Sequence, residues 1–173
     1  MTSQQFDVII IGGGLAGLTS AIHLAQNDFK VLLIEKNSFP KHKVCGEYVS
    51  NEVLPYLEYL GFNPFEFGAK RITNFELTTH NNKTIQTELP LGGFGMSRYQ
   101  MDFQLYKLAL RQGVSVVKDT VDDVIFEHDV LAFKLNQVKV LLQKSLLVPL
   151  GNDPIWILSF SVRSSPKNLH TWV

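Results

Sequence analysis

The stretch that decides the fold runs from Asp7 to Gly17 and reads DVIIIGGGLAG. Its first half is a short run of apolar, β-branched residues, which is typical of a buried parallel strand. The run stops at three glycines, and from Leu15 the apolar residues recur at helical spacing until Asn27-Asp28. A second apolar run, Val31–Ile34, follows and is closed by Glu35. A strand, a glycine turn, a helix and a strand within about thirty residues predict a βαβ unit, and hence an α/β fold with a parallel sheet.

The glycine turn has the spacing G-x-G-x-x-G, and each glycine has a physical reason. Gly12 permits the tight turn out of the strand, Gly14 lets the backbone approach a pyrophosphate, and Gly17 lets helix and strand pack closely. The pyrophosphate would bind to free N–H groups at the start of the helix, around Leu15 and Ala16, where the helix dipole favours negative charge. The pattern predicts a Rossmann-like dinucleotide site.

The acidic residue that ends the second strand supports this interpretation. Glu35 stands eighteen residues after Gly17, where a carboxylate accepts hydrogen bonds from ribose hydroxyls. An acid at this position argues against a 2′-phosphate, and therefore against NADP at this site. The glycine pattern alone is weak evidence for a dinucleotide site. Together with the preceding strand, the following helix and the acid, it makes a glycine turn without a ligand the less favoured alternative.

Three segments together resemble a known family. Residues 7–17, followed by Glu35-Lys36, resemble the FAD-binding start of the flavoproteins that include aromatic hydroxylases and geranylgeranyl reductases. Lys43–Glu47 (KVCGE) resembles the K-x-C-G-E of the reductase branch, and Ser97–Asp102 (SRYQMD) resembles the S-R-x-x-x-D that opens a cofactor-contacting helix. The resemblance covers Phe6 to about Leu135 and implies FAD as the cofactor. The residues that it places near FAD are Gly12, Gly14, Leu15, Ala16, Gly17, Glu35, Lys36, Cys45, Gly46, Arg98 and, through its backbone, Val121.

Several of these residues also have non-functional interpretations. Cys45 could be a buried small hydrophobic residue, and Arg98 could be a surface residue at a helix start. His23 and His42 are expected to pack or to face solvent. No Cys/His cluster has metal-ligand spacing, so no metal site is predicted. No catalytic residue is identified, since hydride chemistry would belong to the flavin.

The rest of the pattern predicts the domain organisation. A hairpin insertion is expected at about residues 70–95, with strands at Ile72–Thr79 and Thr84–Leu89 and a glycine-rich return at Pro90–Gly95. A helix at Tyr99–Gln112, a strand at Val114–Val117 and a second hairpin within residues 121–135 follow. Residues 1–135 are therefore expected to form an FAD-binding domain.

Residues 136–173 are expected to be a divergent tail rather than a domain. They hold both tryptophans and a single acid, Asp153, and their periodicity fits neither helix nor strand. Family members continue further, through a G-A-x-G-x-x-S strand and a sheet domain for the substrate, so the fold is expected to be incomplete at its C-terminus. Truncation, a genuine end and a frameshift are open alternatives. Shifting the codons of Asp153–Trp156 back by one base can spell arginine, serine, asparagine and leucine.

Composition excludes some classes of partner. Lys plus Arg and Asp plus Glu are both 16, and this neutrality gives no electrostatic case for nucleic acid. The single cysteine, the missing secretory signal and the lack of a membrane-spanning run predict a soluble, cytoplasmic protein.

The resemblance implies a function for the full-length protein. That function is FAD-dependent reduction of an isoprenoid or lipid-like double bond, with NAD(P)H as a candidate electron donor. The 173-residue chain itself is expected to be inactive, because it lacks the substrate region of the family. Two alternatives stay open: an FAD-dependent monooxygenase of the aromatic-hydroxylase type, and an inert truncated FAD-binding fragment with no catalysis. The sequence is silent on the substrate.

Overall fold

The structure is a computed structural model that describes residues 6–127, 130–135, 139–143, 146–150 and 155–159. Its main sheet has five strands in the order β10-β11-β1-β2-β6. Strands β1 (Val8–Ile11) and β2 (Val31–Glu35) are parallel, and β6 (Ser115–Lys118) is parallel to β2. Helix α1 (Leu15–Gln26) connects β1 to β2, and α3 (Arg98–Arg111) precedes β6. The predicted βαβ unit and the α/β fold are confirmed.

The main core lies between this sheet and helices α1 and α3. Alternate residues of β1 and β2 face the helices, and the residues between them, Ile9, Leu32 and Ile34, are buried as well. Burial of successive residues explains why both strands read as continuous apolar runs rather than as an alternating pattern. The core includes Val8, Ile10, Leu18, Ile22, Val31, Leu33, Leu105 and Ala109.

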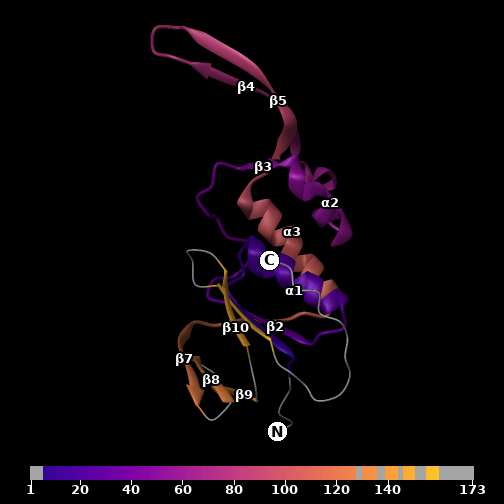
Figure 1. Cartoon of the computed structure of the whole chain (residues 1–173), viewed down its shortest axis with the longest axis vertical. Coiled ribbons are helices and arrows are strands. Elements are labelled where there is room, and N and C mark those ends of the chain that lie inside the picture. The colour runs from indigo at the N-terminus through magenta and orange to yellow at the C-terminus, as the bar shows by residue number, and fades with distance from the viewer. Residues whose placement is uncertain (1–5, 128–129, 136–138, 144–145, 151–154, 160–173) are drawn as a thin grey trace.

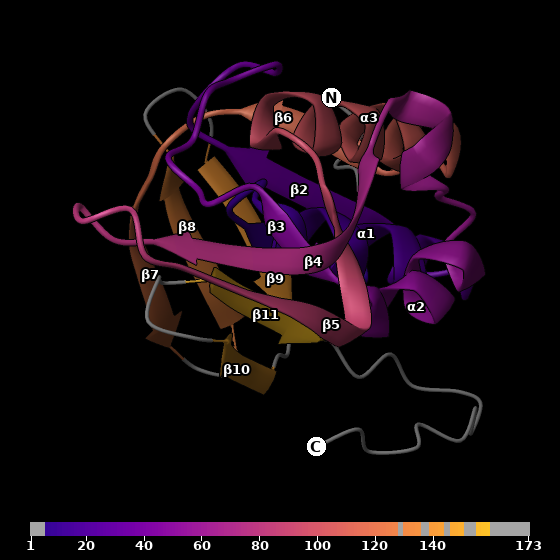
Figure 2. The ribbon, with the colours of Figure 1, turned by 90° about the horizontal axis from the view of Figure 1, so that it is seen from above.

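A long hairpin extends from the body of the molecule (Figure 1) and is seen from above in Figure 2. It consists of β4 (Lys70–Thr78) and β5 (Thr84–Gly95), and β3 (Tyr48–Ser50) pairs with the base of β5. The predicted hairpin is confirmed, but the expected return at residues 90–95 is wrong because β5 continues through it. A Cβ on Gly93 would lie 2.4 Å from the Tyr48 ring, so glycine serves close strand packing here rather than a turn.

Three short helical segments join β3 to the hairpin. They are the 3-10 turn at Asn51–Val53, α2 (Leu54–Tyr59) and the 3-10 turn at Pro64–Phe67. Leu57 and Leu60 are buried, and the chain leaves α2 through Gly61 at φ +79°, a conformation that suits glycine at a helix end.

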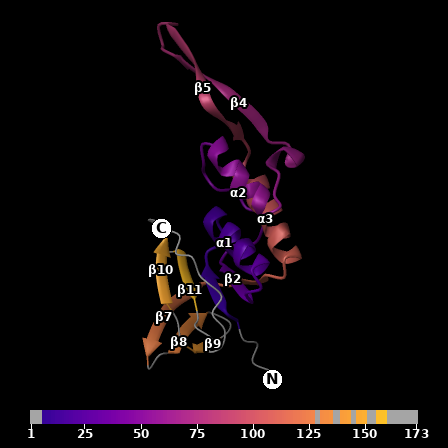
Figure 3. The same ribbon diagram turned by 45° about the vertical axis from the view of Figure 1, so that its right-hand side comes forward.

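The chain after β6 forms more strands than the sequence predicts. Strands β7 (Val121–Glu127) and β8 (Val130–Leu135) confirm the second hairpin, and β9 (Lys139–Gln143) pairs with β8. This sheet lies away from α1 and α3 (Figure 3).

The expected domain boundary at residue 135 is followed by strands that pair with earlier parts of the chain. Strand β9 continues the β7–β8 sheet, and β11 (Ile155–Ser159) pairs antiparallel with β1 and with β10 (Leu146–Leu150). Apolar runs of five residues are too short for periodicity to reveal them as strands. The domain limits therefore stay a prediction.

Candidate functional site

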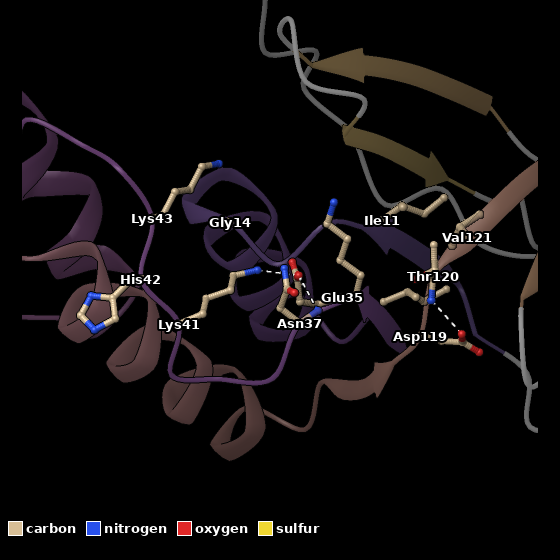
Figure 4. A pocket seen from close by; sticks show the side chains of 13 residues that line it. Ile11, Gly14, Glu35, Asn37, Lys41, His42, Lys43, Asp119, Thr120 and Val121 are labelled. Carbon is tan, nitrogen blue, oxygen red and sulfur yellow. Dashed lines mark hydrogen bonds and ion pairs between the residues drawn. The ribbon is translucent and has the colours of Figure 1, made fainter.

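A pocket of ≈ 500 Å³ opens beside the glycine turn, at the carboxyl ends of β1, β2 and β6 (Figure 4). This edge of a parallel sheet is where ligands bind in α/β folds. The lining residues come from three separate stretches of the chain: Ile11, Gly12 and Gly14; Ile34, Glu35, Lys36, Asn37, Lys41, His42 and Lys43; and Asp119, Thr120 and Val121.

The three motif glycines lie in different surroundings. Gly12 has φ +103°, a conformation that side chains rarely adopt, and its N–H donates to the Ile34 carbonyl at 2.8 Å. A Cβ on Gly17 would lie 1.9 Å from the Gly12 carbonyl oxygen, so only glycine permits this approach of helix to strand. At Gly14, by contrast, the nearest atom to an added Cβ is Arg98 Nη2 at 3.9 Å. Space is therefore left open at the one glycine that is expected to face a ligand.

The start of α1 presents unpaired backbone donors to this space. Gly14 is the N-cap residue and has no side chain to cap the helix. The Gly14 carbonyl accepts from Leu18 N–H at 2.9 Å, the first bond of the helix, so the N–H groups of Leu15, Ala16 and Gly17 have no partner within the helix. Ala16 is exposed. Such donors, together with the helix dipole, suit an anionic group.

Glu35 lies at the end of β2, next to the glycine turn, as predicted. The Gly13 N–H donates to Glu35 Oε2 at 2.7 Å, and the Asn37 N–H donates to Oε1 at 2.9 Å. The Lys41 ammonium lies 2.5 Å from Oε1. Burial favours the neutral acid, but the hydrogen bonds from Lys41, Asn37 and Gly13 outweigh it and lower the pKa of Glu35. Glu35 is thus a buried, ionised carboxylate that faces the pocket.

Arg98 stands on the other side of the glycine turn, at the first position of α3. Its Nε and Nη2 donate to the two carboxylate oxygens of Asp102 at 2.8 Å and 2.9 Å. The hydrogen bonds to Asp102 raise the pKa of Arg98 against the effect of burial. Asp102 is fully buried and the Arg98 side chain is 12% exposed. The Arg98 side chain is therefore mostly buried and lies near Gly14, which does not fit a solvent-exposed surface residue.

The remaining predicted residues lie around the same space. Lys36 and Val121 line the pocket with the glycine turn, and the Arg98 guanidinium lies near Gly14. Cys45 and Gly46 are exposed, which excludes a buried, purely packing role for Cys45. The Cys45 thiol is among the smaller contributions to the raised pKa of Arg98, after Asp102.

Sequence reasoning missed several residues that form the site. A Cβ on Gly13 would lie 2.7 Å from Phe39, so the middle glycine of the run is required as well. Asn37, Lys41, Asp119 and Thr120 also line the pocket. The run of three glycines could have indicated that Gly13 is also required. No sequence pattern shows which lysine of the loop forms the ion pair with Glu35.

Comparison with known proteins gives the same family as the geometry. Residues 7–46 match the family described as FAD dependent oxidoreductase. The chain is 32% identical over 129 residues to digeranylgeranylglycerophospholipid reductase 2 of Methanothermobacter thermautotrophicus, covering 72% of this chain and 33% of that protein. A flavin-dependent halogenase of Armillaria mellea is 41% identical over 56 residues, which cover 32% of this chain and 11% of the halogenase.

Solved structures agree with these sequence matches. The geranylgeranyl bacteriochlorophyll reductase-like protein from Thermoplasma acidophilum has 26% identity and a TM-score of 0.65, over 82% of this chain and 38% of that one. The resemblance to FAD-dependent oxidoreductases, with geranylgeranyl reductases among the homologues, is therefore confirmed. The chain spans a third or less of the length of these curated relatives. In the part of the chain that the structure describes, no helix is long and apolar enough to cross a membrane.

Proposed function

Starting from its homology to FAD-dependent oxidoreductases, we propose that this chain binds FAD, with the adenosine diphosphate half in the pocket beside the glycine turn. The open space at Gly14, between the start of α1 and the Glu35 carboxylate, carries the proposal. Leu15, Ala16 and Gly17 would bind the pyrophosphate through their N–H groups, and Glu35 would accept hydrogen bonds from the ribose. Lys36 and the backbone of Val121 would contact the adenosine end.

Arg98 would place a permanent positive charge beside the pyrophosphate. Its guanidinium lies 3.9 Å from the position of a Cβ on Gly14, and Asp102 fixes its orientation through two hydrogen bonds. A guanidinium suits phosphate because it stays charged and presents donors in a fixed plane. Cys45 and Gly46, on the loop near Arg98, would lie toward the flavin half, and FAD, when bound, would supply the redox chemistry.

For the whole protein we propose reduction of an isoprenoid or other lipid-like double bond, with NAD(P)H as a donor. The KVCGE segment and the 32% identity to a digeranylgeranylglycerophospholipid reductase support this substrate class. The proposal includes a cytoplasmic location and an FAD-binding domain at residues 1–135.

A second candidate is oxygen-dependent flavin chemistry, as in an aromatic-hydroxylase-type monooxygenase. Halogenases among the relatives, two of them described as flavin-dependent, support this second candidate. The two candidates differ in their need for oxygen. NADPH consumption that depends on an unsaturated isoprenoid lipid and persists under anaerobic conditions would favour the reductase, whereas consumption that stops without oxygen would favour the alternative.

The binding proposal itself is tested by competition. FAD is titrated into the purified chain while flavin fluorescence is followed, and ADP is then added to the complex. We expect FAD to bind and ADP to displace it, because the site described here recognises the part that the two molecules share. FAD binding that ADP does not affect, or no FAD binding at all, would overturn the assignment.

A further inference from the structure

Lys41 reaches the Glu35 carboxylate from the loop that follows β2 (Figure 4). Its Nζ lies 2.5 Å from Glu35 Oε1, and the two side chains are only 18% and 7% exposed. An ion pair this well shielded differs from the usual surface pair, whose attraction is screened by water.

The bonds to Glu35 leave a defined place for one more donor. A carboxylate has about four lone-pair positions for hydrogen bonds. The Gly13 N–H occupies one position on Oε2, and the Asn37 N–H and the Lys41 ammonium occupy two on Oε1. One position is left, on Oε2, and Glu35 is one of the residues that line the pocket. A ribose hydroxyl can therefore bind without displacing Lys41.

The loop that carries Lys41 is anchored to the body of the fold. The Phe39 ring stacks on the Tyr106 ring of α3, with centroids 4.5 Å apart and planes 12° apart. The same ring packs against Gly13, where an added Cβ would lie 2.7 Å from it. The Lys41 ammonium also lies 5.3 Å from the centre of the Phe39 ring. These contacts fix the loop two residues before Lys41 and direct the lysine toward Glu35.

We infer that Lys41 is a positioning residue of the adenosine site, which holds the Glu35 carboxylate ionised and oriented so that its remaining lone pair accepts a ribose hydroxyl. The inference rests on the proposed function and deepens it. Lys41 acts through Glu35, and it keeps a buried acid in the charged form that can only accept hydrogen bonds.

The charges around Glu35 support this role. Burial alone would raise the pKa of Glu35, and the hydrogen bond and charge of Lys41 act against burial together with the Asn37 and Gly13 N–H groups. The glycine turn contributes no ionisable side chain. Among the described residues, the other ionisable side chains that line the pocket are Lys36, His42, Lys43 and Asp119. Lys118 pairs with Glu35 across β2 and β6, and Arg98 lies beyond Gly14.

The test compares the whole chain with its Lys41→Met and Lys41→Arg variants. The Glu35 pKa is measured by carbon NMR of the labelled carboxylate, and AMP affinity is measured by calorimetry between pH 5 and pH 8. In Lys41→Met we expect the Glu35 pKa to rise. AMP affinity at pH 7 should fall about tenfold, because the Glu35 carboxylate is no longer held in place for its charge-assisted hydrogen bond to the ribose. Affinity should also fall further toward pH 5 in this variant than in wild type. Lys41→Arg should restore both properties, and Lys83→Met, in the distant hairpin turn, is the matched control.

Three outcomes would contradict the inference, and they are distinguishable. An unchanged Glu35 pKa together with unchanged AMP binding in Lys41→Met would remove the role of Lys41 and leave the proposed function intact. Tighter AMP binding in Lys41→Met would show that Lys41 competes with the ribose for Glu35. A wild-type chain that does not bind AMP would overturn the proposed function on which the inference depends.

Discussion

At the scale of single residues, two glycines of the same turn are expected to tolerate substitution differently. A Cβ on Gly17 meets the Gly12 carbonyl oxygen at 1.9 Å, whereas one on Gly14 meets only the end of the Arg98 side chain at 3.9 Å. We expect Gly17→Ala to destabilise the fold by about 3 kcal/mol, since backbone atoms must move. The free energy of unfolding of Gly14→Val should stay within about 1 kcal/mol of the wild-type value, because the extended backbone at this position suits valine.

The same pair separates binding from folding. Gly14→Val should abolish FAD binding, because its side chain fills the space expected for the pyrophosphate. Urea unfolding and FAD titration of the two variants measure the two effects. A Gly14→Val protein that is folded and binds FAD like wild type would show that the pyrophosphate lies elsewhere.

Glu35 gives a pH dependence whose sign follows from its surroundings. Its pKa in the folded chain is lowered from the usual 4.5, so the ionised form stabilises the fold. This contribution is fully present above the usual value and is lost as the pH falls through the lowered one. The difference in free energy of unfolding between wild type and Glu35→Gln should therefore be largest near pH 7 and shrink below about pH 4.5. A difference that grows on acidification would contradict the ionised, hydrogen-bonded carboxylate described here.

At the scale of elements, the start of α3 depends on the pair that Arg98 forms with Asp102. Asp102 is fully buried and accepts both hydrogen bonds from the guanidinium. Asp102→Asn removes the charge and leaves a shielded cation, which should cost about 3 kcal/mol. FAD binding should weaken as well, because Arg98 loses its orientation beside Gly14. Arg111→Ala, on the exposed last turn of the same helix, is the control, and thermal unfolding of both variants is the measurement. Equal stability of the two variants would mean that the pair does not hold α3.

The sequence predicts some of these elements much better than others. The unit from β1 to β2 follows from its glycines and its apolar runs, because both reflect local backbone requirements. The end of β5 could not be predicted in this way. A glycine such as Gly93 indicates a turn in the sequence, whereas in the structure it makes room for the Tyr48 ring. Strands β9 to β11 are short runs with no readable period, so their pairing depends on distant contacts. Lys41 was missed for the same reason, because its contact with Glu35 is set by how the loop folds.

At the scale of the whole molecule, the site is assembled from segments that are far apart in sequence. The turn at residues 12–17, the stretch at 35–46, the start of α3 and Val121 meet at one edge of the sheet. The hairpin β4–β5 extends from the body and contributes none of the residues that line this pocket (Figure 1). The proposed dinucleotide site thus lies at one edge of the main sheet, and the hairpin arm lies apart from it.

The most direct test of this account is an amide NMR titration of the chain with ADP. We expect shifts at Gly14, Leu15, Ala16 and Gly17, at Glu35 and Lys36, and at Val121, because the backbone of these residues surrounds the proposed adenosine site. The hairpin amides, from Lys70 to Leu89, should not move. Shifts confined to the hairpin, or no shifts at saturating ADP, would contradict the central claim that this sheet edge holds the adenosine half of FAD.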